Sequence, residues 1–538
     1  MKHFFKILFS VVIIILLTSN CARKGRPSGG LKDSIAPIMV IANPPYKSIH
    51  FSSKKIKISF DEYITLKNIN QQLIISPPLK FLPTITPQGS PSEDITIKLT
   101  DTLKENTTYT FNFGNSIQDN NEGNQLKNFK YVFSTGAYID SLKIKGHIKD
   151  AFQKEFEKNI SVLLYKIDST YNDSIIYRKK PNYVANTTDS TLFNITNIAK
   201  GKYLLLALQD VSNNYLFNPR EDKIGFYNRI IELPTDSIIN EPIALFKEIN
   251  PFRFTRPKQV SKGKLLFGFE GDRKNITIEL LSKVSNNFKS ILKFEPKKDT
   301  LNYWHTSIKN DSLVFKVSKD KFIDTVTVFL RKKIIDSLKI NSNVTTILDL
   351  RDTLTLTSNN PITNIDRSRI LFIEGDSVTV PYTNLVDVKT NEIKFMFSKK
   401  NNTSYALKLL PKALTDVFKT QNDTLNYLFN TKEPEDYASI RLNIIKNPTS
   451  QIIVELLSEQ NNKRIEKIVV SNNTSVHFKL LPPGKYIVRA IIDANKNSKW
   501  DTGSYLKKIK PEKIMYHPTI FSLKSNWDVV DPEPFIIN

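Results

Sequence analysis

Oxygen-bearing side chains recur at alternate positions in the stretch DANKNSKWD, near the C-terminal end of the sequence. Counted from its first residue, positions 1, 3, 5 and 9 are Asp493, Asn495, Asn497 and Asp501. Calcium-binding loops present ligand oxygens at this spacing, with a backbone carbonyl at position 7. Two of their features are missing, because position 6 is Ser498 instead of glycine and position 12 is Ser504 instead of a bidentate acid. The stretch is therefore a candidate for a weak calcium site.

The same residue types also form ordinary turns, because Asp and Asn side chains accept hydrogen bonds from nearby backbone groups. In that interpretation the stretch is a hydrogen-bonded strand connection, with Trp500 packed over the end of a β-sandwich. A related stretch begins at Asp210 and keeps an acid, Glu221, at position 12, but it has Tyr215 where a sharp turn favours glycine. Each stretch lacks a different part of the calcium ligand set, so both interpretations stay open.

Signals of enzymatic chemistry are thin in the rest of the chain. It has no HExxH pair, GxSxG elbow or phosphate-binding glycine loop, and only 16 glycines in all. The neighbouring acids Asp61 and Glu62 would point to opposite faces of a strand, which does not favour a shared substrate. We expect no catalytic residue. The histidines beyond the N-terminal segment are isolated from one another in the sequence: His50, His147, His305, His477 and His517.

The N-terminal segment has the layout of an export signal. A short basic opening precedes an apolar run over residues 7–17, which is too short to span a bilayer. The letters LTSNC that follow resemble a bacterial lipobox, although Asn20 stands where a smaller residue is usual. Cys21 is the only cysteine, which excludes a disulfide framework and a thiolate metal site. We expect a signal peptide over residues 1–20, a lipid anchor on Cys21 and a flexible tether over residues 21–35.

The chain is strongly basic, with 77 Lys and Arg against 53 Asp and Glu and a formal net charge of +24. The basic residues are scattered through the expected strands, and no basic arm or zinc-finger spacing gathers them. Together with the export signal, this distribution argues against nucleic acid as a partner. We interpret the charge as solvated strand faces with some attraction to anionic lipid or polysaccharide.

The periodicity beyond the tether is that of β-strands. Short β-branched and aromatic runs, such as KKIKISFDEYITL from Lys54 and DTVTVFLRKK from Asp324, are bounded by Asn, Pro, Gly and Asp. Long helical patterns are absent from the sequence. Because 538 residues exceed what one core accommodates, we expect an all-β chain of tandem β-sandwiches.

Two internal repeats support this organisation. The first aligns GKYLLLALQD with GKYIVRAIID, so that four positions match in pairs: Gly201 with Gly484, Tyr203 with Tyr486, Ala207 with Ala490, and Asp210 with Asp493. The second aligns residues 107–135 with 403–431, so that Tyr109 matches Tyr405, while Asp119 and Asp416 fall one place out of register. The sequence thus contains a two-module unit twice, with a further β-rich segment between the copies.

The first module resembles the SbsA-type bacterial Ig-like domain. The resemblance rests on ordered pieces: APIMVIANPP from Ala36, IKISFDEYI with its Phe60-Asp61-Glu62, LIISPP from Leu73, and the closing Phe133-Ser134-Thr135-Gly136. The modules around the GKY…D repeat resemble transthyretin-like or collagen-adhesin B-type sandwiches. Together with Cys21, this layout is similar to Ig-like-domain lipoproteins of Gram-negative bacteria. The resemblance implies a fold and an outer-membrane address, on either the periplasmic side or the cell surface.

These observations predict a series of modules after the signal peptide and tether. They are an SbsA-type Ig-like domain over residues 36–136, a transthyretin-like sandwich over 137–250, a β-rich Ig-like segment over 251–344, a diverged second Ig-like domain over 345–433, and a second transthyretin-like sandwich over 434–538.

Asp followed by Ser or Thr and then an apolar residue recurs along the chain, for example at Asp33-Ser34-Ile35 and Asp140-Ser141-Leu142. This pattern resembles an acceptor motif for O-glycosylation of exported proteins in some Gram-negative bacteria. It is also what a turn entering a strand looks like, because Asp and Ser favour turns and an apolar β-former follows. Ser34, within the expected tether, is the best candidate for the modification.

The leading functional expectation is a non-catalytic structural or interaction protein, whose loops contact another envelope protein or a glycan. A second hypothesis is a polysaccharide- or peptide-binding accessory of nutrient uptake. Exposed aromatic residues at Tyr303, Trp304 and His305 would favour it if they lined a groove, although strand alternation puts Trp304 opposite the other two. A third hypothesis, an enzyme with a site between domains, would need converging carboxylates.

Overall fold

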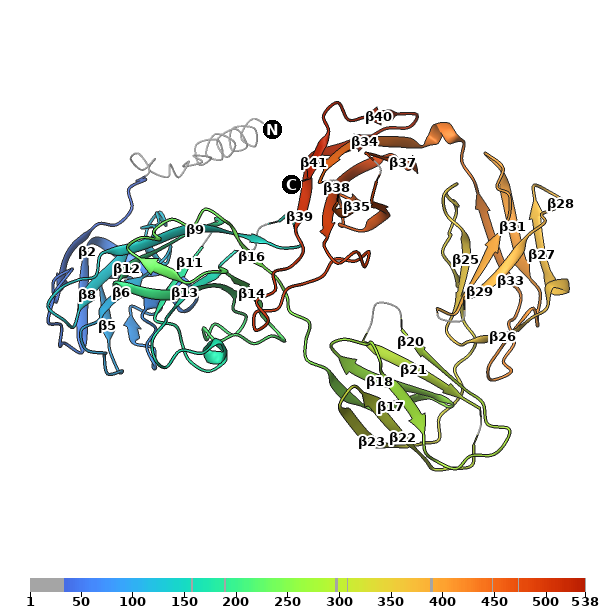
Figure 1. Cartoon of the computed structure of the whole chain (residues 1–538), viewed down its shortest axis with the longest axis horizontal. Coiled ribbons are helices and arrows are strands. Elements are labelled where there is room, and N and C mark those ends of the chain that lie inside the picture. The colour runs from blue at the N-terminus through green and yellow to red at the C-terminus, as the bar shows by residue number, and fades with distance from the viewer. Residues whose placement is uncertain are drawn as a thin grey trace, which may run out of the picture. The chain divides into compact units, whose positions relative to one another are not determined.

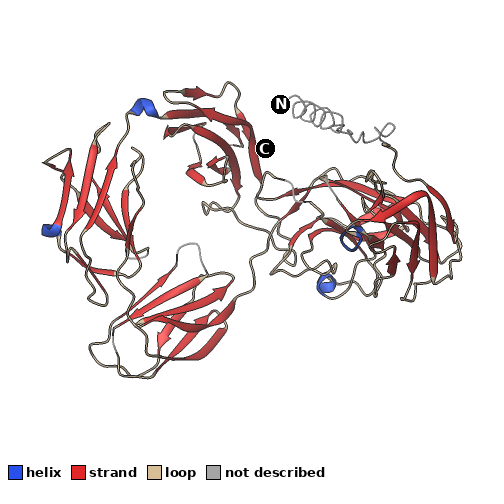
Figure 2. Cartoon of the chain, turned by 180° about the vertical axis from the view of Figure 1, so that it is seen from behind, coloured by secondary structure: helices blue, strands red, loops and turns tan. Residues whose placement is uncertain are grey.

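The computed structural model describes residues 33–537, apart from 156–157, 188–189, 296–298, 307, 388–389, 448 and 473 (Figure 1). Strands make up almost all of its regular structure, as Figure 2 shows, and the predicted all-β class is confirmed. In the described part of the chain, no helix has the length and apolar character needed to cross a membrane. Cys21 and the expected signal peptide lie outside the described residues.

The chain divides into two compact units. The first unit holds the described residues up to Lys143 together with Asn182–Val184 and Thr196–Ala199. The second unit holds Ile144–Pro181, Ala185–Ile195 and the chain from Lys200 onward.

The first sandwich lies in the first unit. Its elements are β1 (Met39–Asn43), β2 (Lys55–Leu66), α2 (Ile69–Gln72), β3 (Ile74–Ser76), β4 (Thr84–Thr86), β5 (Ser92–Lys98), β6 (Thr108–Asn112), β7 (Ile117–Asp119) and β8 (Lys130–Ser134). One sheet has the order β1-β2-β5-β4, with β7 also paired to β2, and the other has the order β3-β6-β8. In β2, Ile56 and Ile58 are fully buried while Lys55 and Lys57 are exposed, because successive side chains of a strand point to opposite faces.

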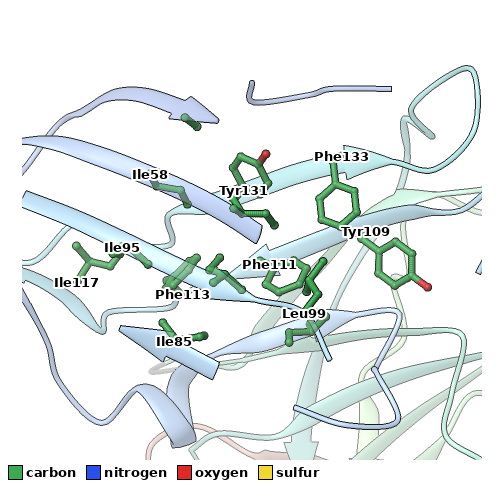
Figure 3. Close-up of a cluster of buried hydrophobic side chains, with 14 of the residues drawn as sticks. Ile58, Ile85, Ile95, Leu99, Tyr109, Phe111, Phe113, Ile117, Tyr131 and Phe133 are labelled. Atoms are coloured by element: carbon green, nitrogen blue, oxygen red, sulfur yellow. The ribbon is translucent and has the colours of Figure 1, made fainter. Parts of the chain in front are cut away.

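The core between these two sheets combines aliphatic side chains, mostly isoleucines, with a group of aromatic rings (Figure 3). Phe133 lies at its centre, with its ring centroid 3.8 Å from that of Phe51 and 5.5 Å from that of Tyr109. Stacked aromatic rings bury a large apolar area for few residues, which suits a domain of this size.

The second sandwich contains the elements from β9 to β16. They are β9 (Leu142–Asp150), β10 (Ser161–Lys166), η1 (Asp173–Tyr177), β11 (Tyr183–Asn186), β12 (Leu192–Ile198), β13 (Gly201–Gln209), β14 (Lys223–Phe226), β15 (Ile231–Leu233) and β16 (Ile243–Leu245). Strand β13 pairs antiparallel with β10, β14 and β15. The last strand, β16, returns to pair parallel with the first strand, β9.

The fifth sandwich, at the C-terminal end, repeats this arrangement. Its elements are η3 (Pro434–Asp436), β34 (Ala438–Lys446), β35 (Gln451–Ser458), β36 (Arg464–Val470), β37 (Ser475–Leu481), β38 (Gly484–Asp493), β39 (Ile514–Leu523), β40 (Asp528–Val530) and β41 (Phe535–Ile537). Strand β38 pairs antiparallel with β35 and β39, and the last strands, β40 and β41, pair parallel with the first, β34. Ala207 lies opposite Val162 in one copy, and Ala490 lies opposite Val454 in the other, so the sequence repeat is also a structural repeat.

Two further sandwiches lie between these copies in the sequence. The third contains β17 (Arg253–Ser261), β18 (Lys264–Glu270), β19 (Thr277–Leu280), β20 (Ser290–Phe294), β21 (Thr300–His305), β22 (Ser312–Lys319) and β23 (Phe322–Phe329). The fourth contains β24 (Ile340–Ser342), β25 (Leu354–Ser358), β26 (Ile362–Ile365), η2 (Arg367–Arg369), β27 (Ile370–Glu374), β28 (Val378–Thr379), β29 (Thr383–Asp387), β30 (Glu392–Met396), β31 (Ser404–Leu409), β32 (Leu414–Asp416) and β33 (Leu425–Asn430). Each of them has its own apolar core.

The repeat of residues 107–135 over 403–431 extends to individual hydrogen bonds. The Tyr109 hydroxyl accepts the backbone N–H of Lys104 at 2.9 Å, and the Tyr405 hydroxyl accepts that of Lys400 at the same distance. The ring of Tyr405 stacks on Phe429, with centroids 5.6 Å apart, as the ring of Tyr109 stacks on Phe133. The tyrosine thus fixes the turn before its own strand in both sandwiches.

Asp119 and Asp416 occupy equivalent places in the two sandwiches, although the sequence alignment sets them one position apart. Asp119 is the last residue of β7 and Asp416 is the last residue of β32, and both side chains are buried. Each carboxylate accepts backbone N–H groups of the loop that follows, from Glu122, Gly123 and Asn124 in one case and from Phe418 and Thr420 in the other. A buried aspartate that closes a loop is therefore a shared device of both domains.

We expect the replacement of either tyrosine by phenylalanine to destabilise the protein. The Tyr109→Phe and Tyr405→Phe variants lose the acceptor of one backbone N–H, which lowers the free energy of unfolding by about 1 kcal/mol each. Tyr138→Phe is the matched control, because its ring is 70% exposed. Chemical denaturation of the full chain measures the difference, and effects as small as that of Tyr138→Phe would contradict the role assigned to the hydroxyls.

Candidate functional site: the Asp493 loop and its docking surface

The Asp493 loop, residues 494–513, connects β38 to β39. The carboxylate of Asp493 is buried where β38 ends, and it accepts the backbone N–H groups of Asn497 at 3.0 Å and Ser498 at 2.8 Å. Its Oδ2 also accepts the side-chain amide of Gln451 at 2.7 Å. Lys496 and Ser498 have φ angles of 58° and 60°, so the backbone here turns through the left-handed region. Asp493 therefore closes a tight turn.

The other predicted calcium ligands are bonded to one another. Oδ2 of Asp501 accepts the side-chain amides of Asn495 at 2.5 Å and Asn497 at 2.6 Å. The amide nitrogens of both asparagines thus point at the carboxylate, whereas a calcium ion would need oxygens. The structure brings all four predicted residues together, but as a hydrogen-bonded turn.

The related stretch at Asp210 forms the same turn. Oδ2 of Asp210 accepts the N–H of Tyr215 at 2.6 Å, and Asn213 and Tyr215 have φ angles of 51° and 60°. Tyr215 thus adopts the conformation for which glycine is usually selected. Asp222 closes the far side of this loop, since it accepts the N–H groups of Val211 and Asn218. Burial raises the pKa of Asp210, and the turn N–H groups offset only part of that effect.

These observations decide how well the loops fit a cation. Both oxygens of Asp493 and one oxygen each of Asp210 and Asp501 already accept hydrogen bonds within their own loop. Among the described residues, no group of three or more His, Cys, Asp or Glu side chains is arranged to hold a metal ion. The geometry favours the structural turn over the cation site, and the calcium site stays an untested alternative.

Glu512 holds the base of the Asp493 loop, and it was not among the predicted site residues. Its carboxylate accepts the N–H of Ala494 at 2.8 Å and that of Asp501 at 3.0 Å, while its backbone carbonyl accepts the indole N–H of Trp500. Burial raises the pKa of Glu512 despite these donors. The sequence carries no signal for this role, because Glu512 lies outside the ligand spacing and meets the loop only in the fold.

The outer part of the loop docks on the second sandwich, within the second unit. The ring of Tyr505 is fully buried and lies edge-on against Phe226, with centroids 5.8 Å apart. The Tyr505 N–H is donated to Glu248 and the Thr502 hydroxyl to the carbonyl of Lys247, both at 2.5 Å. A side chain at Gly503 would come within 2.7 Å of the Phe246 ring, so only glycine fits there.

Ion pairs flank this contact on both sides. Lys508 pairs with Asp173 at 2.6 Å, and Lys510 pairs with Glu241 at 2.5 Å. Behind the ion pairs lies a cavity of about 370 Å³, walled by Phe226 and Phe246 and by residues 510–514. Its carboxylates are engaged, since Glu241 is paired and Glu512 accepts backbone N–H groups. They do not form a pair of free acids.

A buried ion cluster supports the docking contact from the fifth sandwich. Glu455 pairs with Arg489 at 2.6 Å and with Arg464 at 2.8 Å, and the Arg489 guanidinium carbon lies 4.2 Å from the centre of the Phe152 ring. Burial alone raises the pKa of Glu455, but the hydrogen bonds and charges of the two arginines outweigh it, so the pKa lies below its ordinary value. The sequence did not predict this cluster, because an isolated glutamate in a strand is ordinarily expected to lie on a solvent-exposed face.

The aromatic cluster of β21 is not an exposed platform. Tyr303, Trp304 and His305 are only 4%, 2% and 3% exposed, so the three rings do not form an exposed surface on which a glycan could stack. The alternation was correct: Tyr303 and His305 pack together in the core with ring centroids 6.1 Å apart, whereas Trp304 lies on the other face beneath Lys264.

The remaining residues singled out in the sequence are a pair of neighbouring acids and the candidate glycosylation site. Asp61 is exposed and accepts the N–H of Ile38 at 2.8 Å, while Glu62 is half-buried on the other face of β2. Ser34 is exposed beside Asp33, which accepts the N–H of Ile35. The glycosylation prediction is compatible with that exposure and stays a prediction.

A buried pair of one histidine and one aspartate was also not predicted from the sequence. Nε2 of His517 lies 2.7 Å from a carboxylate oxygen of Asp531, and Nδ1 of His517 accepts the N–H of Thr519. Both members are almost completely buried, with Phe521 and Phe535 packed against the imidazole. The pair ties β39 to the segment before β41.

We expect Asp493→Ala to destabilise the protein by about 1–3 kcal/mol, because two backbone N–H groups lose a buried acceptor. Asp501→Ala should cost less, since its partners are side-chain amides in an exposed loop. Equilibrium unfolding of the full chain measures both changes. In a calorimetric titration with calcium we expect no saturable heat; saturable heat that Asp493→Ala and Asp501→Ala both abolish would establish the cation site instead.

We expect Glu455→Gln to cost about 3–5 kcal/mol at neutral pH, because Arg489 stays buried without its counter-charge. The pKa of Glu455 is lowered in the folded state, so its contribution is present above the unfolded-state pKa of about 4.3 and is lost as the pH falls below it. The difference between wild type and Glu455→Gln should therefore shrink towards pH 3. Glu459→Gln, at an exposed site, is the control, and a difference that did not depend on pH would contradict this assignment.

Comparison with known proteins supports the fold. Residues 33–135 match the profile of a family described as a bacterial Ig-like domain. No curated protein sequence is significantly similar to the chain.

Solved structures with tandem domains are similar at low identity. Domains 1–6 of the surface layer protein SbsC are 12% identical over 86% of this chain and 66% of that one, with a TM-score of 0.14. The SGBP-B protein of a Bacteroides ovatus mixed-linkage glucan utilization locus is 10% identical over 64% and 85%, with a TM-score of 0.19. The Bacillus anthracis TIE protein is 10% identical over 95% and 75%, with a TM-score of 0.13. The family match identifies residues 33–135 as similar to bacterial Ig-like domains.

Proposed function

We propose that the chain is a non-catalytic protein of the bacterial cell envelope, anchored by lipid on Cys21, whose sandwiches serve as structural and interaction modules. The observation that carries the proposal is the tandem array itself, in which separate β-sandwiches each bury their own core. The Asp493 loop makes contacts with the second sandwich instead of presenting reactive groups. Such an array is suited to spacing and presenting binding surfaces away from a membrane.

The address rests on the sequence. The basic opening, the apolar run over residues 7–17 and the single cysteine at position 21 support export and lipidation, since a diacylated cysteine holds a protein stably on a bilayer. By resemblance, the membrane is the outer membrane of a Gram-negative bacterium. The basic residues after Cys21 weigh slightly towards the periplasmic side.

A second candidate function is the binding of polysaccharide or peptide as an accessory of nutrient uptake. The buried aromatic cluster no longer supports it, but the net charge of +24 and the basic cavity in the third sandwich favour an acidic ligand. An enzyme with a site between domains is less favoured, because the carboxylates beside the cavity at Phe226 and Phe246 are already engaged in the structure.

Labelling with radioactive palmitate tests the anchor. We expect the full chain to carry the label and to sediment with membranes, and Cys21→Ala to lose both properties. Ser34→Ala, within the expected tether, is the matched control and should behave like wild type. A Cys21→Ala variant that still incorporated palmitate would overturn the proposal.

A further inference from the structure

A second cavity of about 370 Å³ lies at one end of the third sandwich. It is bordered by the turn between β17 and β18, the end of β21, and the chain that leaves β23. This size falls within the range of about 300–1,000 Å³ that is typical of small-molecule pockets. It has no part in the Asp493 loop or in its docking contact.

The rim of the cavity is cationic. We call it the basic rim; it consists of Lys262, Lys309, Arg331, Lys332 and Lys333, all of which are exposed. Asp311 is the only acidic residue in the lining. Across the described residues, no carboxylate lies within ion-pair distance of any member of the rim. Five like charges around one concave surface attract an anion, since a cleft concentrates their field.

The segment that supplies most of these charges is held in place. The Arg331 N–H is donated to the side chain of Gln259 at 2.7 Å, and Lys262 donates its N–H to the carbonyl of Ile334 at 3.0 Å. The Lys333 ammonium donates to the carbonyls of Gln259 and Val260. These bonds set the positions of the basic residues before any ligand arrives, so that binding orders exposed side chains and not the backbone.

The inner wall is apolar with a buried imidazole. Ile308, Leu330, Ile335 and Phe418 provide the apolar surface, and Phe418 packs so closely on Gly263 that a side chain there would come within 2.5 Å of its ring. His305 lines the same cavity; burial lowers its pKa, so the positive charge comes from the rim. Its Nδ1 lies 2.9 Å from the carbonyl of Thr306, whereas its Nε2 has no hydrogen-bond partner among the described residues.

These features together select a class of ligand. A single inorganic anion is a few water molecules in size and would leave most of the cavity unfilled, since each water takes up about 30 Å³. A ligand that fills the cavity needs an apolar face for the inner wall, hydroxyl groups for polar atoms and negative charges for the rim. Sugar rings that carry carboxylate or sulfate groups combine all three.

We propose that this cavity binds an acidic oligosaccharide, whose carboxylate or sulfate groups pair with the basic rim while its rings pack on the apolar inner wall. The inference deepens the second candidate function and rests on it. It assigns the glycan contact to the third sandwich and to charge recognition, and not to aromatic stacking at β21.

Fluorescence anisotropy on the full chain tests this inference. The probes are labelled tetragalacturonate, a labelled heparin-derived tetrasaccharide and, as the neutral reference, labelled cellotetraose. We expect an acidic probe to bind, cellotetraose not to bind, and Lys309→Gln with Lys332→Gln to weaken binding about three- to tenfold. The matched control, Lys408→Gln with Lys485→Gln, removes the same charge from exposed strand positions and should bind as wild type does.

Three outcomes would overturn the inference. They are failure of both acidic probes to bind, equal weakening in the two double variants, and loss in Lys309→Gln with Lys332→Gln of binding to anionic phospholipid vesicles but not to the oligosaccharides. The oligosaccharide readouts do not depend on Cys21, so the palmitate result separates failure of the anchor proposal from failure of this one.

Discussion

Every part of the described chain depends on one constraint, which is that two sheets must bury their inner faces against each other. A sandwich of about 100 residues has little interior, so large side chains are needed to fill it. Stacked rings add to the aliphatic core in two of the sandwiches: Phe51, Tyr109 and Phe133 in the first, and Tyr405 and Phe429 in the fourth. Each sandwich buries its inner faces in its own core, so the loops at the ends of the sheets remain accessible. Binding residues are therefore expected on these loops.

Buried polar groups then decide which loops are rigid. Asp119, Asp416 and Asp493 each end a strand and accept the backbone N–H groups of the following turn. The cost of burying a carboxylate is offset by these donors, which water would otherwise supply. A rigid loop can serve as a contact surface: the Asp493 loop holds Tyr505 against Phe226, and the chain after β23 holds the basic rim.

The sequence predicted what short-range periodicity and repetition encode. The alternation of apolar and polar residues in β2 matches its alternating burial. The GKY repeat matches two sandwiches with the same strand pairing. What it missed depends on long-range contact. Glu455 with Arg489, and His517 with Asp531, are ordinary polar residues until the fold buries them together, and Glu512 meets its loop only at the turn's base. One face of the strand that holds Tyr303, Trp304 and His305 was expected to be exposed, but all three are buried, because periodicity gives a side chain's face but not whether that face is covered.

The central claim, that the sandwiches stand outside the cytoplasm on a lipid anchor, is tested most directly by protease accessibility in three stages. An epitope placed after Asn538 is followed in intact cells, in cells with a permeabilised outer membrane, and in lysed cells. The account predicts digestion at the first stage for a surface protein or at the second for a periplasmic one. Protection through the second stage, with digestion only after lysis, would contradict it.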